Sequence, residues 1–138
     1  MNLHPQLKQD CHVIGQFPLS ILLLHKDANY PWFILVPDRL DMTEIFQLNE
    51  NDQQQLMKES CILADALSRK FNADKLNIAA IGNLVPQLHL HHIVRYRDDI
   101  AWPSPIWGLH PPLSYSPEQL AMRIELIGTA DMADLTLT

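Results

Sequence analysis

The chain has 138 residues, of which 47% are hydrophobic and 19% are charged, and its formal net charge at pH 7 is −6. This length suits one domain with one core, and the composition is close to the average of globular proteins, which argues against long disordered segments. Its lysines and arginines are scattered without a basic stripe, which argues against duplex DNA or RNA as the partner, because such binding rests on many cationic phosphate contacts.

The region before residue 40 predicts a β-hairpin. Residues 1–17 mix polar and apolar side chains and show no clear pattern. Residues 20–25 and 32–36 are apolar runs typical of strands, and the intervening segment 26–31 is rich in turn-forming residues. Two strands joined by so short a turn are most simply an antiparallel pair.

The middle of the chain predicts two helices and a third strand. A short helix is expected at 43–48. A longer helix is expected to start at Asn49 or Asn51, which are good N-caps, and to run to about Phe71, because apolar residues recur there on one helical face. Residues 75–81 then predict a strand.

The last third of the chain predicts a fourth strand and a final helix. Gly82-Asn83 indicates a turn, and residues 87–96 predict the strand. A proline-rich loop follows at 98–115. Ser116 opens a capping-box motif in front of a segment with helical apolar periodicity, so a helix is expected from there to Gly128.

Strands that alternate with helices in this order suggest an α+β fold, in which an antiparallel sheet carries helices on one side. No internal repeat or low-complexity segment divides the chain. We therefore expect a single domain over residues 1–138, with its core at about 14–128 and a loosely held C-terminal tail.

The cysteines and the N-terminal residues indicate the cellular compartment of the protein. Cys11 and Cys61 are the only cysteines and no CxxC motif is present, so the sequence predicts neither a zinc knuckle nor a redox pair. Two unpaired thiols are typical of a reducing compartment. Residues 1–6 lack the apolar stretch of a signal peptide, and the longest apolar runs are too short to span a membrane. We expect a cytoplasmic protein.

Two histidines stand two residues apart in the predicted fourth strand. Side-chain alternation directs Gln87, His89 and His91 to one face of that strand, about 7 Å from neighbour to neighbour. Leu88 and Leu90 point to the opposite face and are expected to be buried. Imidazoles side by side on one face are costly unless they meet water, a metal ion or an anion such as phosphate. The pattern therefore favours a functional site over satisfied core histidines.

The stretch QLHLHHI at 87–93 resembles the His-φ-His-φ-His-φ-φ motif of the histidine triad (HIT) family, in which φ is apolar. Further segments occur in the order expected for that family: DANYPW at 27–32, ILVP at 34–37, GNLVP at 82–86 and WPSPIWG at 102–108. Together they resemble a divergent bacterial branch of HIT proteins in which Gln replaces the first His. The resemblance spans roughly residues 14–110.

The resemblance implies a HIT-like fold and a nucleotide hydrolase or nucleotidyl transferase. The middle His of the motif is the family's nucleophile, so His89 would attack the α-phosphorus of a nucleotide and form a nucleotidyl-histidine intermediate. A backbone carbonyl, here that of Gln87, would fix the tautomer of the nucleophile. His91 would donate a hydrogen bond to phosphate oxygens near the leaving group, and the Gln87 amide could donate another.

The resemblance implies further site residues and a homodimer. Asn83 is expected to donate a hydrogen bond to phosphate. Asp27 matches the place of the family's ribose-binding acid, although a turn-forming Asp explains it equally well. No cofactor is expected. Surface or structural roles are expected for the four histidines outside the motif strand: His4, His12, His25 and His110.

Two alternatives to an enzyme stay open on the sequence. One is a non-catalytic nucleotide-binding module with a degraded motif, which would bind a mononucleotide without turnover. The other is a metal protein, because His-x-His on a strand is also a zinc-ligand spacing, but that site needs a third ligand and none stands at a telling position. Metal analysis of the purified protein would separate the metal site from the other two.

Overall fold

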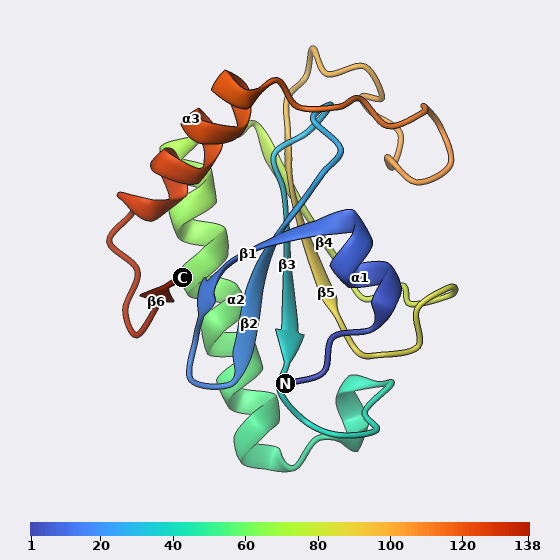
Figure 1. Cartoon of the computed structure of the whole chain (residues 1–138), viewed down its shortest axis with the longest axis vertical. Helices are drawn as coiled ribbons and strands as arrows, with labels where there is room; N and C mark the ends of the chain where they lie inside the picture. Colours follow the sequence, from blue (N-terminus) through green and yellow to red (C-terminus); the bar gives the residue numbers. More distant parts are fainter.

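The computed structural model describes all 138 residues and contains a six-stranded antiparallel sheet in the order β4-β5-β3-β2-β1-β6 (Figure 1). The strands are β1 (Cys11–Gln16), β2 (Ser20–His25), β3 (Trp32–Pro37), β4 (Lys75–Ala79), β5 (Leu90–Arg95) and β6 (Thr136–Leu137). The helices are α1 (Pro5–Asp10), α2 (Glu50–Lys70) and α3 (Pro117–Gly128), with a short 3-10 helix, η1, at Ile45–Gln47 where a short helix was predicted. The predicted α+β fold is confirmed.

Strand β3 lies inside the sheet and is buried on both faces. It pairs with β2 as the predicted hairpin, with Leu22 opposite Leu35, and with β5 on its other side. Phe33 and Leu35 pack into the core beneath α2, whereas Ile34 packs into a second cluster on the opposite face. Burial on both faces explains why this strand reads as a continuous apolar run instead of an alternating one.

Helix α2 covers one face of the sheet through its apolar side. Leu56, Leu63 and Leu67 recur at helical spacing and are fully or almost fully buried against the strands. The helix begins after Asn49, whose side chain accepts a hydrogen bond from the backbone N–H of Asp52, so one of the two N-caps predicted is confirmed. No helix of the structure combines the length and apolar character needed to cross a membrane.

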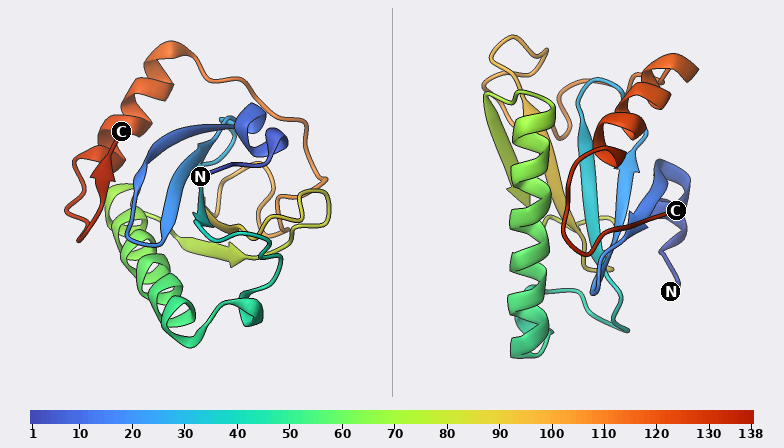
Figure 2. Two further views of the ribbon diagram at one scale, coloured as in Figure 1. Left: turned by 60° about the horizontal axis from the view of Figure 1, so that its bottom comes forward. Right: turned by 90° about the vertical axis from the view of Figure 1, so that its left-hand side faces the viewer.

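The expectation of helices on one side of the sheet is wrong, because residues 1–17 form an additional helix and strand. Figure 2 shows α1 and α2 on opposite sides of the sheet. Leu3 and Leu7 anchor the N-terminal segment in the second apolar cluster. A six-residue helix with one buried residue, Leu7, leaves no long periodic pattern, which is why the sequence did not predict it.

The expected loose tail is also corrected. Helix α3 begins after Ser116 as predicted, but beyond it Met132 is buried and β6 extends the sheet by pairing with β1. Thr138 donates a backbone hydrogen bond to Ile14 at 3.0 Å. The close approach depends on Gly15, because a Cβ there would lie 2.6 Å from the carbonyl oxygen of Thr136.

Strand β5 starts at Leu90, three residues later than predicted. The backbone N–H of Leu88 donates to the carbonyl of Met42 at 2.9 Å instead of joining a neighbouring strand. Leu88 and Leu90 are nevertheless buried beneath α2, as predicted. Residues 87–89 therefore lie outside the sheet, so the alternation of side chains along a strand does not determine where Gln87 points.

Candidate active site

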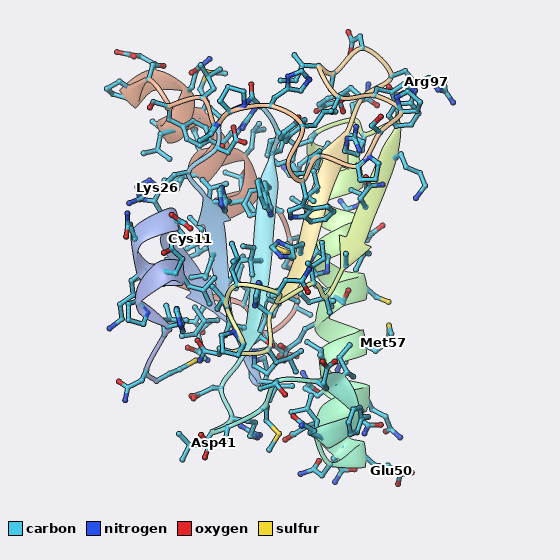
Figure 3. All side chains as sticks on the ribbon, turned by 90° about the vertical axis from the view of Figure 1, so that its right-hand side faces the viewer. Cys11, Lys26, Asp41, Glu50, Met57 and Arg97 are labelled. Atoms are coloured by element: carbon cyan, nitrogen blue, oxygen red, sulfur yellow. The ribbon has the colours of Figure 1, made fainter.

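A cleft of about 680 Å³ opens on the face of the sheet that carries α1. It is lined by α1 and the residue before it, by the cleft-facing ends of β2, β3 and β5, by residues 81–85 of the β4–β5 loop, and by Trp107 and Gly108. Figure 3 views the molecule from the side of the β4–β5 loop, with Cys11 beside α1 and Met57 on α2. His89, His91 and Asn83 all line this cleft, so the structure brings together three of the predicted site residues.

His89 is held with one ring nitrogen free. Its Nδ1 lies 2.7 Å from the carbonyl oxygen of Gln87, and because a carbonyl only accepts, Nδ1 carries the hydrogen. Nε2 therefore keeps its lone pair in the neutral ring. Gly82, at φ +60°, brings the β4–β5 loop over the ring, since a Cβ built there would lie 3.9 Å from His89 Cε1. The imidazole is thus fixed in orientation and in tautomer.

The ring of His91 is held in the opposite tautomer to that of His89. Its Nδ1 lies 3.0 Å from the indole Nε1 of Trp32, and an indole N–H only donates, so this nitrogen accepts and Nε2 carries the hydrogen. Burial, with smaller contributions from three neighbouring imidazoles, lowers the pKa of His91 to about 3. His91 is therefore a neutral hydrogen-bond donor across the physiological pH range.

Aromatic rings connect the two histidines to the rest of the cleft. The rings of His25 and Trp32 stack with centroids 3.7 Å apart and planes 9° from parallel. His91 lies 5.7 Å from Trp32 and 4.8 Å from His89. Trp107, from the proline-rich loop, packs edge-on against both Trp32 and His91. Strands β2, β3 and β5 and the loop thus contribute to one row of rings.

The Gln87 side chain lies outside the cleft, although alternation predicted it beside the histidines. Its Oε1 accepts from the backbone N–H of His4 at 2.8 Å, and its Nε2 donates to the carbonyl of Asn2 at 3.1 Å. The amide therefore ties down the N-terminal segment, while the backbone carbonyl of the same residue orients His89. The reason is that residue 87 precedes β5, so the strand geometry does not extend to it.

Asp27 also lies outside the cleft lining. It is buried, and its Oδ1 accepts from the backbone N–H groups of Asn29 at 3.0 Å and of Leu113 at 3.1 Å. The side chain therefore shapes the β2–β3 turn and joins it to the segment before α3. Of the two interpretations from the sequence, the turn-forming one describes these contacts.

His4 and His25, which were expected to have surface or structural roles, line the cleft. His25 Nδ1 accepts from the backbone N–H of Asp27 at 3.0 Å, and His4 Nδ1 accepts from that of Gln6 at 3.1 Å. Their Nε2–H groups are therefore the free donors of the neutral rings. No local pattern reveals His25, because its place depends on strand register; for His4 the only signal is Pro5, which favours the first turn of a helix.

His92 follows the two site histidines in the sequence but faces away from the cleft. It is fully buried beneath α2, where its Nδ1–H donates to the carbonyl of Leu90 at 3.1 Å and its Nε2 lies 2.7 Å from Ser60 Oγ. No group of three His, Cys, Asp or Glu side chains in the structure is arranged to hold a metal ion.

Residues 6–98 match the family model of the HIT domain. The chain is similar to the solved structure of a histidine triad protein from Bradyrhizobium japonicum, with 48% identity and a TM-score of 0.92 over 94% of this chain and 96% of that chain. The chain is 46% identical to a histidine triad protein from Marinobacter aquaeolei VT8, with a TM-score of 0.89 over 91% of this chain and 92% of that chain. It is 36% identical to one from Sinorhizobium meliloti 1021, with a TM-score of 0.91 over 94% of this chain and 96% of that chain. No curated protein sequence matches the chain significantly.

Proposed function

Because this chain belongs to the HIT domain family, whose members bind nucleotides and are often nucleotide hydrolases or transferases, we propose that it is an enzyme of this kind. The reaction that we propose is attack of His89 Nε2 on the α-phosphorus of a nucleotide conjugate. A covalent nucleotidyl-histidine forms and is then released to water or to another acceptor.

The observation that carries this proposal is the tautomer of His89. The hydrogen bond from Nδ1 to the carbonyl oxygen of Gln87, 2.7 Å long, leaves the Nε2 lone pair as the nucleophile in the cleft. The neutral ring needs no general base in order to attack, because its Nε2 already carries the lone pair. The orienting group is a backbone carbonyl, so this arrangement does not depend on which side chain stands at position 87.

The neighbouring groups of the cleft suit a phosphate. In the proposed step the bond from His89 Nε2 to phosphorus forms while the bond to the leaving group breaks, and the electron pair of that bond moves to the leaving group. His91 would donate its Nε2–H to the oxygens on which charge develops. Asn83, from the turn of the β4–β5 loop, would donate through its amide to the same phosphate.

One observation favours the second candidate, a non-catalytic nucleotide-binding module. The cleft lining includes no Lys or Arg, so the charge of a transition state would be met by neutral N–H groups alone. Such a module would bind a mononucleotide in the same cleft without turning over its conjugates.

The experiment that separates the two is a turnover screen on the purified protein. The substrates are dinucleoside polyphosphates, nucleotide sugars and nucleoside phosphoramidates, each with adenine and guanine, and His89→Ala is the blank. We expect turnover that disappears in His89→Ala. Mononucleotide binding by calorimetry without turnover of any substrate would favour the binding module, and equal rates in both proteins would assign the activity to a contaminant.

We also propose a homodimer in the cytoplasm. Strand β4 is an unpaired edge of the sheet on which Ile78 is 47% exposed, and such an edge suits pairing with a second copy. Both cysteines, Cys11 and Cys61, are free thiols, as expected in a reducing compartment. Light scattering on the purified protein measures the mass directly, and Ile78→Lys is expected to shift a dimer toward the monomer.

A further inference from the structure

Gln87 holds the N-terminal segment with both ends of its side-chain amide. Its Oε1 accepts from the backbone N–H of His4 at 2.8 Å, and its Nε2 donates to the carbonyl of Asn2 at 3.1 Å. The donor and the acceptor of an amide lie side by side, so one side chain can make both bonds to a short stretch of backbone. An imidazole at position 87 would direct its two nitrogens away from each other and would not make this pair of bonds.

The polar groups of His4 are held by the protein with one exception. The backbone N–H donates to Gln87, and the backbone carbonyl accepts from the N–H of Lys8 in α1 at 3.1 Å. The ring Nδ1 accepts from the backbone N–H of Gln6 at 3.1 Å, so the hydrogen of the neutral ring is on Nε2. The ring is therefore fixed in orientation, and Nε2–H is the remaining donor of a residue that lines the cleft.

His4 is attached to the same residue as the nucleophile. The main-chain carbonyl of Gln87 accepts from His89 Nδ1 at 2.7 Å, while the side chain of Gln87 holds His4. Leu3, which lies between the two residues tied to Gln87, is buried in the apolar cluster beside α1 and anchors the segment. The other cleft imidazole with an available Nε2–H, that of His25, is tied instead to the β2–β3 turn.

The cleft has few donors for a bound phosphate. Its lining contains no Lys or Arg, so neutral N–H groups have to meet the negative charge. His91 and Asn83 supply two of these groups. A phosphate presents several acceptor oxygens, and an oxygen that loses water without gaining a donor raises the cost of binding. A further N–H fixed at the wall of the cleft would lower this cost.

We infer that His4 is a further catalytic residue, which donates its Nε2–H to a phosphate oxygen of the bound nucleotide, and that Gln87 is the positioning residue that holds it there. The inference rests on the proposed function for its ligand, a nucleotide phosphate. His4 keeps its proton throughout, because the contact is a hydrogen bond and no covalent bond of the ring changes. The Gln that replaces the first His of the motif thus recruits a histidine more than 80 residues away.

The wild-type protein allows a first test by NMR at pH 7.5. Long-range ¹H–¹⁵N spectra should show His4 with a protonated Nε2 and an unprotonated Nδ1. The Nε2 signal should shift when AMP is added to saturation and should stay in place with adenosine, which lacks the phosphate. Equal shifts with both ligands, or no shift with AMP, would overturn the inference. This result does not depend on the folding of a variant.

The variant His4→Asn removes the donor while keeping the cap of α1. Asn is a favourable N-cap, so its Oδ1 can accept the Gln6 N–H as the imidazole does, but its side chain is too short to replace Nε2. His12→Asn is the matched control, because His12 lies on β1, next to α1 in the chain, and does not line the cleft.

The affinities for AMP and adenosine separate a phosphate contact from a general effect on the cleft. In His4→Asn we expect the Kd of AMP to rise about tenfold or more, as is typical when a charged group loses one hydrogen bond, and the Kd of adenosine to stay unchanged. In His12→Asn both values should equal those of the wild type. An unchanged Kd of AMP in His4→Asn, or an equal rise for both ligands, would overturn the phosphate contact.

A double-mutant cycle tests whether Gln87 acts through His4. The loss of kcat/KM for a nucleotide conjugate should be about 10²-fold in His4→Asn and smaller in Gln87→Ala, and the double variant should be no worse than His4→Asn. Fully additive losses would overturn the positioning role of Gln87. Absence of His89-dependent turnover would overturn the proposed enzyme instead, and the same cycle on the Kd of AMP would then decide the inference.

Discussion

His91 and His92 are adjacent in β5, yet they lie on opposite faces of the sheet and in different chemical surroundings. On the α2 face, His92 uses both ring nitrogens, one toward the carbonyl of Leu90 and the other toward Ser60 Oγ. On the cleft face, His91 uses only Nδ1, which accepts from Trp32, and its Nε2 has no partner in the protein. His92 is therefore a satisfied core residue, whereas His91 has a donor available to a ligand.

Burial alone does not distinguish the cleft histidines from the core histidine in this chain. His89 and His91 are 6% exposed and His92 is 0% exposed, a difference too small to separate their roles. The number of ring nitrogens with a fixed protein partner does separate them, because it is one for the cleft pair and two for His92. Variants on the two faces should therefore fail in different ways.

The largest effect is expected for His89→Ala. Loss of the nucleophile should lower kcat by about 10⁴-fold or more, because the covalent step cannot run without it. The free energy of unfolding should change little, since the ring makes one hydrogen bond and borders an open cleft. Steady-state turnover and urea unfolding of the same preparation measure both. Strong destabilisation with near-normal turnover would show that His89 is a structural core residue, as His92 is, and not the nucleophile.

The second effect is expected for His91→Ala, on the same face. Removing one donor to the phosphate oxygens should lower kcat by about 10²–10³-fold, which is typical of a single oxyanion donor, and should leave residual turnover. The measurement is kcat with a nucleotide anhydride at saturating concentration. If His91→Ala lost as much activity as His89→Ala, the two residues would act as one unit and the division of roles would fail.

On the other face, His92→Ala should mainly lower stability. The change leaves a cavity, an unpaired Ser60 hydroxyl and an unpaired carbonyl of Leu90 beneath α2, for a combined loss of about 2–4 kcal/mol in the free energy of unfolding. Turnover per folded molecule should stay within about tenfold of wild type. Urea unfolding and activity at a temperature where the variant is folded test this, and a loss of activity without loss of stability would contradict it.

The stability of the protein should depend on pH through His92. Burial lowers the pKa of His92 to about 4, whereas in the unfolded chain the residue protonates near pH ~6.5. The unfolded state then binds more protons between these values, so this stability is fully present above about 6.5 and is lost as pH falls toward 4. Between pH 7 and pH 5 the loss is about 2 kcal/mol. Urea unfolding should show a correspondingly smaller loss in His92→Gln; equal losses in the two proteins would contradict the prediction.

The smallest effect is expected for Gln87→Ala. The side chain makes two hydrogen bonds to the backbone of the N-terminal segment, at Asn2 and His4, so its loss should lower stability by about 1–2 kcal/mol. Hydrogen exchange of the His4 amide should speed up, and KM should rise more than kcat falls, because that segment lines the cleft. A fall in kcat as large as that of His91→Ala would show that the Gln87 side chain takes part in the reaction.

Elements with local signals were predictable from the sequence. These signals depend only on residues close together in the sequence: the apolar runs of β2 and β3, the Asn49 cap of α2 and the Ser116 cap of α3. The N-terminal helix and β6 were not, because they depend on distant partners. Leu7 finds its place only against the sheet, and β6 pairs only because Gly15 lets the two backbones approach.

The same division applies to the site. The spacing of His89 and His91 is local, and both residues line the cleft as predicted. Trp32 and His25 come from two other strands, and only the register of the sheet brings them to His91. The Gln87 side chain was misplaced because β5 begins after it, and its partners lie more than 80 residues away in the chain.

Trapping the intermediate shows whether His89 Nε2 forms a covalent bond to phosphorus. Wild-type protein is mixed with a labelled nucleotide anhydride, quenched in base within milliseconds to seconds, and digested for mass spectrometry. The predicted result is a nucleotidyl adduct on His89 that survives base and is lost in acid, as expected of a phosphoramidate bond, and that is missing from His89→Ala. Turnover by wild type with no adduct at any quench time, or with the adduct on another residue, would contradict the role of His89 as nucleophile.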